Sequence, residues 1–425
     1  MHAFYGMTNK RKIINDPVFG FLSIPNDLIF DVLQHPYVQR LSRIRQLGLS
    51  YLVYPGAMHS RFGHSLGAMH LMQEAIQSLR LKDVAITAEE ETAAMIAILL
   101  HDVGHGPFSH VLEHTIVDGV AHEDISLLMM ERINLDLHGR LAMAIAIFKN
   151  EYSKHFLHQL ISSQLDVDRM DYLCRDSFFT GVQEGRVASE RLLKMLDVRD
   201  DRLVVQVKGI YSVEKFLVAR RLMYWQVYLH KTSVAAEQHL IKILSRAKEL
   251  ARGGVPNGYP GQEPLLFCSP ALRYFLYQNI GFDKFSPTSE ALEQYALLDD
   301  NDVLSAIKAW ISSEDKVLSV LSESFVNRRL FRGERLEKPL TEDEKQALNK
   351  QYAAAIGVSE ADAAYLWSEH VSTSNTYSEK ADTIDILYSD GTVRDIAEAS
   401  EILDLESLTR KPEKRYLFKF RNDGI

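Results

Sequence analysis

Residues 93–110 read AAMIAILLHDVGHGPFSH, an apolar run followed by three histidines within ten residues. The preceding T-A-E-E pattern from Thr87 is typical of a capping box, so a helix is expected to lead into this stretch. Gly104 and the pair Gly106-Pro107 are expected to end that helix. The apolar run is far too short to span a bilayer. The stretch therefore predicts a core helix whose polar end carries histidine and aspartate.

Helical patterns dominate the chain on both sides of this stretch. Two helices are expected within residues 26–48, with Pro36 opening the second, and a third over 60–79. Further helices are expected over 122–134, 139–149, 155–164, 168–179, 186–197, 212–251, 269–279, 302–312, 315–323 and 341–356. The long helix over 212–251 is a candidate subunit interface, although a core or solvated helix is equally consistent with its sequence.

Short β-type runs lie near both ends of the chain. Residues 12–25 are expected to form a hairpin or edge strands, and 384–396 a hairpin through Asp390-Gly391, while 50–55, 203–207 and 415–420 are expected to be extended. The loop-like GGVPNGYPGQEP marks a boundary near 253–264. The sequence thus predicts a mostly α-helical fold in two parts: a helical core with a hairpin over 1–255, and an α+β lobe over 256–425.

Composition limits the class of protein. The formal net charge is -9, which argues against a nucleic-acid binder that works by bulk electrostatics. Only Cys174 and Cys268 are present, so a disulfide framework is excluded and a reducing compartment fits. The first residues lack the apolar core of a signal peptide. A cytoplasmic protein without a membrane span is expected.

Four separate pieces of sequence offer nitrogen and oxygen ligands for a metal. They are His64, the pair His101-Asp102, the pair His122-Glu123 and Asp168. Two imidazoles and two carboxylates suit a six-coordinate divalent ion such as Mn, Fe, Mg, Ni or Zn. Adjacent residues lie about 100° apart around a helix, so His101 and Asp102 can share one ion only at the helix end. Taken singly, each residue is more often structural; the joint pattern favours a metal centre.

The order and spacing of four motifs resemble those of the HD-domain metal-dependent phosphohydrolases, and within them the deoxynucleoside triphosphate triphosphohydrolases. The motifs are YPGAMHSRFGHSLG (54–67), HDVGHGPFSH (101–110), HED (122–124) and DVDRMDYLCRD (166–176). The resemblance covers residues 12–251. It implies that one divalent ion is held by His64, His101, Asp102 and Asp168. It further implies a nucleotide substrate, attack at its α-phosphorus, release of inorganic triphosphate, and a homo-oligomer (dimer or tetramer).

The same resemblance implies catalytic roles for four residues. His110 resembles the general acid that protonates the leaving 5′ oxygen, and Glu113, about one helical turn later, would orient it. His105 and His122 resemble the residues that contact the α-phosphate and its transition state.

Substrate contacts are implied for seven further residues. Arg61 and Arg169 resemble phosphate-binding cations, although relatives often have lysine where this chain has Arg169. Tyr172 and Tyr228 resemble sugar-side aromatics, Gln46 and Asp176 resemble contacts to the 3′-hydroxyl, and Leu47 resembles an apolar neighbour of the 2′ position. Two alternatives stay open: an HD-type hydrolase of another phosphate ester, such as a nucleoside monophosphate, and a nucleotide-binding regulatory protein with an idle site.

Overall fold

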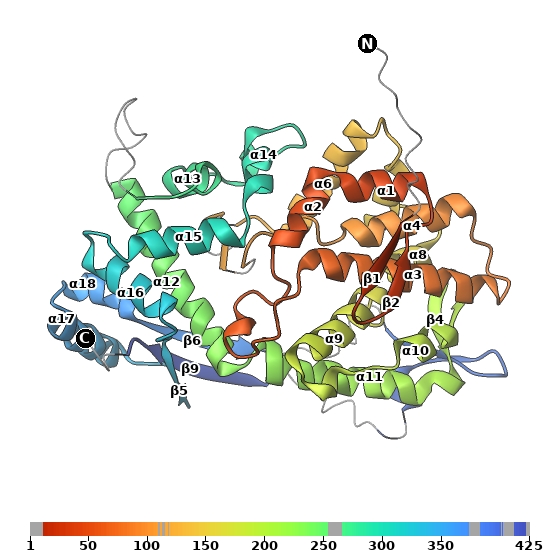
Figure 1. The fold of residues 1–425 in the computed structure, drawn as a ribbon. Coiled ribbons are helices and arrows are strands. Elements are labelled where there is room, and N and C mark those ends of the chain that lie inside the picture. Colours follow the sequence, from red (N-terminus) through yellow and green to blue (C-terminus); the bar gives the residue numbers. More distant parts are fainter. Residues whose placement is uncertain are drawn as a thin grey trace, which may run out of the picture.

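The structure is a computed structural model and describes residues 12–108, 111–112, 115–117, 119–253, 266–373, 383–400, 402 and 412–421. It is mostly helical, with three small sheets among these residues, as the sequence predicts. Figure 1 shows the elements up to α11 on one side of the molecule and those from α13 to β6 on the other, with the long helix α12 among the latter.

The first part of the chain supplies a hairpin and a helical core. The hairpin pairs β1 (Ile13–Asp16) with β2 (Gly20–Ser23). The helices that follow are α1 (Asp27–Gln34), α2 (Pro36–Gln39), α3 (Arg61–Arg80), α4 (Ala88–Leu100), α6 (His122–Asp136), α7 (Ala142–Phe148), α8 (His155–Gln159), α9 (Val167–Thr180) and α10 (Ser189–Met195). The antiparallel pair β3 (Leu196–Arg199) and β4 (Arg202–Gln206) comes next, followed by α11 (Ile210–Met223) and α12 (Lys231–Gly253).

Local sequence fixes where the two central helices begin. The capping box predicted at Thr87 is present: its hydroxyl accepts from the Glu90 backbone N–H, and the Glu90 carboxylate accepts from Thr87 N–H. Ser60 caps α3 by accepting from the Gly63 backbone N–H. These bonds satisfy backbone donors that no helical carbonyl reaches, so α3 and α4 begin at defined residues.

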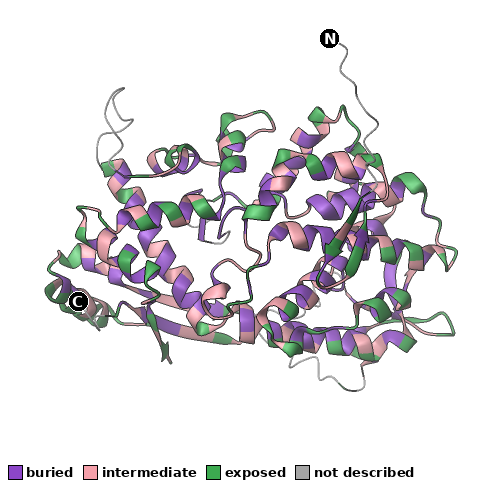
Figure 2. Cartoon of the chain, in the orientation of Figure 1, coloured by how far each residue is buried: buried purple, intermediate pink, exposed green. Residues whose placement is uncertain are grey.

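The core centres on α3, which packs against both α4 and α9. Its buried side includes Leu66, Met69 and Met72, and α4 is buried continuously from Ala93 to Leu100. Figure 2 shows buried residues along α3 and α4. Helices α3, α4 and α9 therefore form one packed unit, and side chains at their facing ends are held close together.

The predicted continuous helix over 212–251 is wrong in one respect, because it is interrupted. Helix α11 ends at Met223, a π-helical turn spans Tyr224–Tyr228, and α12 begins at Lys231. The segment expected to be extended over 50–55 instead contains the 3-10 turn Ser50–Leu52. Helix α8 also ends earlier than predicted. The boundary placed near 253–264 falls almost wholly on residues outside the described part of the chain.

The C-terminal elements combine helices with strands from both parts of the chain. The helices are α13 (Pro270–Tyr277), α14 (Glu290–Leu297), α15 (Asp300–Trp310), α16 (Lys316–Val326), α17 (Glu342–Ile356), α18 (Glu360–Ala363) and α19 (Ile396–Ala399). One sheet has the order β5 (Arg332–Leu336), β9 (Glu413–Lys419), β6 (Trp367–Thr373), all antiparallel. The predicted hairpin β7 (Asp385–Leu387) and β8 (Val393–Asp395) is present, and β7 pairs in parallel with β4. No described helix is long and apolar enough to cross a membrane.

His239 on α12 is a fully buried histidine that packs in the core. Its ring stacks on Phe331 at 4.4 Å between centroids, and its Nε2 donates to the Leu321 carbonyl at 3.0 Å. Burial lowers the pKa of His239 to about 3, despite that hydrogen bond. Because the folded pKa lies below the unfolded value of 6.5, the unfolded chain binds the extra proton, and stability is lost as the pH falls below 6.5.

Between pH 6.5 and pH 5 this one group is expected to remove about 2 kcal/mol from the free energy of unfolding. Denaturant titrations at both pH values, with EDTA present, measure the change. His239→Gln is expected to lose less stability over the same interval than the unsubstituted protein, while His138→Asn, at an exposed turn, keeps the original slope. Equal pH slopes for His239→Gln and the unsubstituted protein would show that His239 does not resist protonation.

Candidate functional site

Three helix ends meet at the predicted metal site. His64 lies in the first turn of α3, His101 caps the C-terminus of α4, and Asp168 lies in the first turn of α9. Ligand atoms of these three residues all lie within 4.8 Å of one another. His64 Nε2 is 3.1 Å and His101 Nε2 is 3.4 Å from the same carboxylate oxygen, Oδ1 of Asp168. The packing of α3 on α4 and α9 thus brings together side chains more than a hundred positions apart.

The two imidazole nitrogens at this site fit a metal ion. The Nε2 atoms of His64 and His101 are both buried, and neither makes a hydrogen bond of acceptable geometry within the described part of the chain. The opposite nitrogens are engaged: His64 Nδ1 donates to Asp171 and His101 Nδ1 donates to the Ile98 carbonyl, each at 2.7 Å. An imidazole bound in this way offers a free lone pair at Nε2, which is the form that ligates a divalent ion.

Charges at the site favour an added cation. Burial opposes ionisation of Asp168, yet contact with His101 and His64 holds its pKa well below the usual range. Burial likewise opposes protonation of His64, but Asp168 and Asp171 outweigh it and raise its pKa to about 10. Both shifts show that the carboxylates attract positive charge to this point. A divalent ion would supply that charge in place of the protons.

Asp102 lies beside this group and links it to two further predicted residues. Its Oδ1 is 3.3 Å from both His101 Nε2 and His105 Nε2, and its Oδ2 accepts from Arg61 Nη1 at 2.7 Å. The distance from Asp102 Oδ2 to His64 Nε2 is 3.8 Å. Asp102 can therefore approach an ion held by His64, His101 and Asp168, while its Oδ2 stays bound to Arg61.

His105 and His122 lie together next to Asp102. Their rings stack at 3.8 Å between centroids, which brings the start of α6 against the segment that follows α4. Burial and the nearby Arg61 charge lower the pKa of His105 to about 3, despite the contact with Asp102. A neutral His105 can donate one hydrogen bond but carries no charge. His110 and Glu113, predicted as general acid and orienting residue, lie outside the described residues.

A second group of predicted residues lies farther along α9. Asp168, Tyr172 and Asp176 follow one another at four-residue spacing, which places them on one face of that helix. The buried Asp176 accepts from Tyr228 Oη at 2.9 Å, and the Tyr172 and Tyr228 rings meet edge to face at 6.0 Å. Burial raises the pKa values of both tyrosines above their usual range, so they remain neutral donors. The face that begins with a candidate metal ligand thus continues as an aromatic and acidic surface.

The remaining predicted substrate residues are placed differently. Arg169 forms an ion pair with Asp166, and its Nε is buried without a hydrogen-bond partner within the described part of the chain. The Gln46 amide oxygen is likewise buried and unpartnered among the described residues, while its backbone N–H donates to the His59 carbonyl at 3.0 Å. Leu47 is partly buried against the core. The described contacts engage Arg169 with its own helix end and leave a polar atom of Gln46 available.

Sequence reasoning missed several residues that support the site. His59 donates from Nε2 to the second Asp176 oxygen at 2.8 Å, and its ring stacks on Phe179. Asp171 holds His64, and Arg175 in turn holds Asp171. One signal was present: Asp171 and Arg175 lie three and seven positions after Asp168, on nearly the same helix face.

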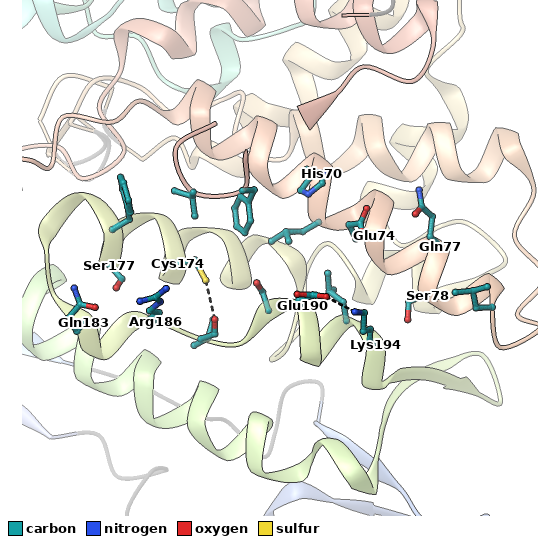
Figure 3. Close-up of a pocket in the computed structure, with 18 residues that line it drawn as sticks. His70, Glu74, Gln77, Ser78, Cys174, Ser177, Gln183, Arg186, Glu190 and Lys194 are labelled. Carbon is teal, nitrogen blue, oxygen red and sulfur yellow. Dashed lines mark hydrogen bonds and ion pairs between the residues drawn. The ribbon is translucent and has the colours of Figure 1, made fainter. Parts of the chain in front are cut away.

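A cavity of about 980 Å³ is lined in part by α3 and α9 (Figure 3). Its wall is formed by the turn of the β1–β2 hairpin, by α3, by the end of α9 and by α10. Labelled side chains around it include His70, Glu74, Cys174, Arg186, Glu190 and Lys194. None of the predicted site residues lines this cavity. The candidate site is therefore defined by the converging side chains and not by this hollow.

Comparisons with known proteins identify the family of the chain. The HD domain family matches residues 61–176, and the HD associated region matches residues 187–252. A crystal structure of a phosphohydrolase from Bacteroides thetaiotaomicron is 55% identical, covers 97% of this chain and 100% of that chain, and superposes with a TM-score of 0.92.

Two relatives known from their sequences extend the comparison. The uncharacterized protein YwfO of Bacillus subtilis is 35% identical over 77% of this chain and 72% of that protein. The deoxynucleoside triphosphate triphosphohydrolase SAMHD1 homolog of Dictyostelium discoideum is 30% identical over 58% of this chain and 52% of that protein. The chain belongs to the HD-domain phosphohydrolase superfamily, in the branch that contains the deoxynucleoside triphosphate triphosphohydrolases.

Proposed function

We propose that this protein hydrolyses deoxynucleoside triphosphates to deoxynucleoside and inorganic triphosphate. The observation that carries the proposal is the convergence of His64, His101 and Asp168, with two buried Nε2 atoms left for an ion. Asp102 completes the proposed ligand set. Membership of the superfamily and the sequence similarity to the SAMHD1 homologs support the choice of substrate.

The residues around the proposed ion would manage the phosphate groups. A divalent ion, when bound, offsets negative charge on the phosphates and makes water a better nucleophile. His105, kept neutral by burial, can donate a hydrogen bond to a phosphate oxygen. The His122 ring stacks on that of His105 and therefore lies beside the same phosphate oxygen. Arg61 places a guanidinium against Asp102, and its Nε has no partner within the described part of the chain. His110 is proposed to protonate the leaving 5′ oxygen, oriented by Glu113.

The α9 face is proposed to bind the sugar. Tyr172 offers a flat apolar surface close to Asp168, and Asp176 offers carboxylate oxygens one turn farther on. His59 and Tyr228 each donate to a different oxygen of Asp176, so the carboxylate is fixed in orientation. A fixed acceptor of this kind suits the 3′-hydroxyl of a deoxyribose, with Gln46 and Leu47 on the remaining sides and Arg169 at the phosphates.

The reaction products test the proposal. The protein is incubated with each of the four dNTPs and Mn²⁺ or Mg²⁺, and the products are separated by anion exchange. Deoxynucleoside and triphosphate are expected in equal amounts. Release of pyrophosphate with a monophosphate would show that the bond between the α- and β-phosphates is broken and not the bond to the 5′ oxygen, and hydrolysis of nucleoside monophosphates alone would identify another phosphohydrolase. Absence of product from every dNTP would overturn the proposal.

Asp176→Asn is expected to lower kcat/KM for dNTPs by about 10- to 100-fold, because it removes a charged acceptor from the sugar. The amide also cannot accept from both His59 and Tyr228. A 2′,3′-dideoxy substrate lacks the hydroxyl that the carboxylate is proposed to bind. The unsubstituted protein should therefore prefer the deoxy over the dideoxy substrate, and Asp176→Asn should largely lose that preference. A preference equal in both proteins would exclude Asp176 as the 3′-hydroxyl acceptor.

A further inference from the structure

A chain of buried charged residues runs from the candidate metal site to the N-terminal hairpin. It begins at His64, whose Nδ1 is 2.7 Å from Asp171 Oδ2. Arg175 binds Asp171 with two hydrogen bonds, from Nε and Nη2, each 2.9 Å long. Its third nitrogen, Nη1, donates to Asp16 Oδ2 at 2.8 Å. The side chains of Asp171 and Arg175 are at most 1% exposed, and that of Asp16 is 5% exposed.

The outer end of this chain is fixed by the hairpin turn. Asp16 is the last residue of β1, and its Oδ1 accepts from the backbone N–H groups of Val18 and Phe19, each at 2.9 Å. The Phe19 ring covers the Arg175 guanidinium at 5.8 Å. The charged residues therefore connect three elements: the turn through Asp16, α9 through Arg175 and Asp171, and α3 through His64.

Helix α3 has a glycine at the position where this chain passes. A Cβ atom added at Gly67 would lie 1.9 Å from Asp171 Oδ1 and 2.2 Å from Arg175 Nη2. Glycine in a helix interior is unfavourable by about 1 kcal/mol relative to alanine. A buried ion pair is also weak evidence for stability, since well-packed apolar residues are often as stable. The arrangement thus points to a role other than simple packing.

The hydrogen bonds between these residues indicate that role. A carboxylate only accepts hydrogen bonds, so the His64 nitrogen that faces Asp171 must carry the proton. The proton is then absent from Nε2 in neutral His64, and Nε2 faces Asp168 and His101. Together, Asp171, Asp16 and Arg175 carry one net negative charge. This charge increases the basicity of the His64 imidazole toward a cation.

We propose that Asp171 is a positioning residue for the metal ligand His64, and that Arg175 and Asp16 hold it in place from the hairpin. This inference rests on the proposed metal-dependent function. Asp171 fixes the tautomer and the ring orientation of His64, Arg175 fixes Asp171 through two bonds, and Asp16 fixes Arg175. The N-terminal hairpin is accordingly part of the support of the metal site, although none of its residues is proposed to touch the ion.

The test measures ion binding and not turnover. Metal-free protein is titrated with Mn²⁺ by calorimetry, and the Co²⁺-loaded protein is examined by visible absorption. Asp171→Asn keeps the shape of the side chain but removes its charge, and it is expected to lower Mn²⁺ affinity about 10- to 100-fold and to alter the Co²⁺ spectrum. Asp16→Asn, at the far end of the chain, is expected to lower the affinity by less.

Asp315→Asn is the matched control. Asp315 binds Arg246 through two hydrogen bonds of 3.1 and 2.6 Å, in a largely buried pair between α16 and α12. Asp315→Asn weakens this ion pair, so it should lower the free energy of unfolding and leave Mn²⁺ affinity unchanged. Unchanged affinity in folded Asp171→Asn would overturn the positioning role; if that variant does not fold, unchanged affinity in Asp16→Asn overturns it. Absence of Mn²⁺ and Co²⁺ binding by the unsubstituted protein would instead overturn the proposed metal-dependent function, and the inference with it.

Discussion

Asp168→Ala is expected to abolish divalent-ion binding and to lower turnover of dNTPs by about 10³-fold or more, since the proposed ion supplies several kcal/mol of charge stabilisation. One oxygen of Asp168 lies within 3.4 Å of the unpartnered nitrogens of both His64 and His101. Its removal takes away a negative charge as well as a ligand. The two imidazoles then face each other without the carboxylate that attracts a cation between them.

Ion content by elemental analysis and Mn²⁺ affinity by calorimetry check this result beside the turnover assay. Asp343→Ala is the control, because Asp343 is exposed in the first turn of α17. It is expected to bind the ion and turn over substrate like the unsubstituted protein. If folded Asp168→Ala retained a stoichiometric ion and normal turnover, the proposed ligand set would be incorrect.

The sequence predicted which residues gather at the site better than it predicted how they are held. His64, His101 and Asp168 stand in motifs whose order identifies them, and the structure places their ligand atoms within 4.8 Å of one another. An Asp-Arg pair four residues apart usually lies on a solvated helix face, so the sequence alone does not identify Asp171 and Arg175 as part of the site. Their full burial depends on α3 passing over them at Gly67, and sequence periodicity does not show such a contact.

Long-range pairing and local helix geometry account for the other differences in the fold. Strands β4 and β7 pair in parallel although their residues lie about 180 positions apart, and no local pattern in either strand specifies its partner. The helical pattern over 212–251 continues through Tyr224–Tyr228, where the structure has a π-helical turn. That turn is where Tyr228 reaches Asp176, so the departure from the regular helix coincides with a proposed substrate contact.

Gly104→Ala is expected to destabilise the protein by about 3 kcal/mol, because a side chain there would be forced into backbone. A Cβ at this position would lie 2.2 Å from the Ser126 backbone nitrogen and 2.4 Å from the His122 carbonyl oxygen. Backbone atoms within α6 cannot move aside singly, so the whole start of the helix must shift. Gly104 also donates to Ser126 Oγ at 2.9 Å, a bond that the shift would break.

The shift would act on the candidate site as well as on stability. His122 is the first residue of α6, and its ring stacks on that of His105. Moving α6 away separates the two rings, so kcat should fall even at temperatures where the variant is folded. Gly63→Ala is the control, since an added Cβ there meets its nearest neighbour, Arg175 Nη1, at an ordinary 3.6 Å. Denaturant unfolding of the control should differ by less than about 1 kcal/mol from the unsubstituted protein. Equal stability of Gly104→Ala and Gly63→Ala would mean that the segment after α4 does not lie against α6 as closely as the structure places it.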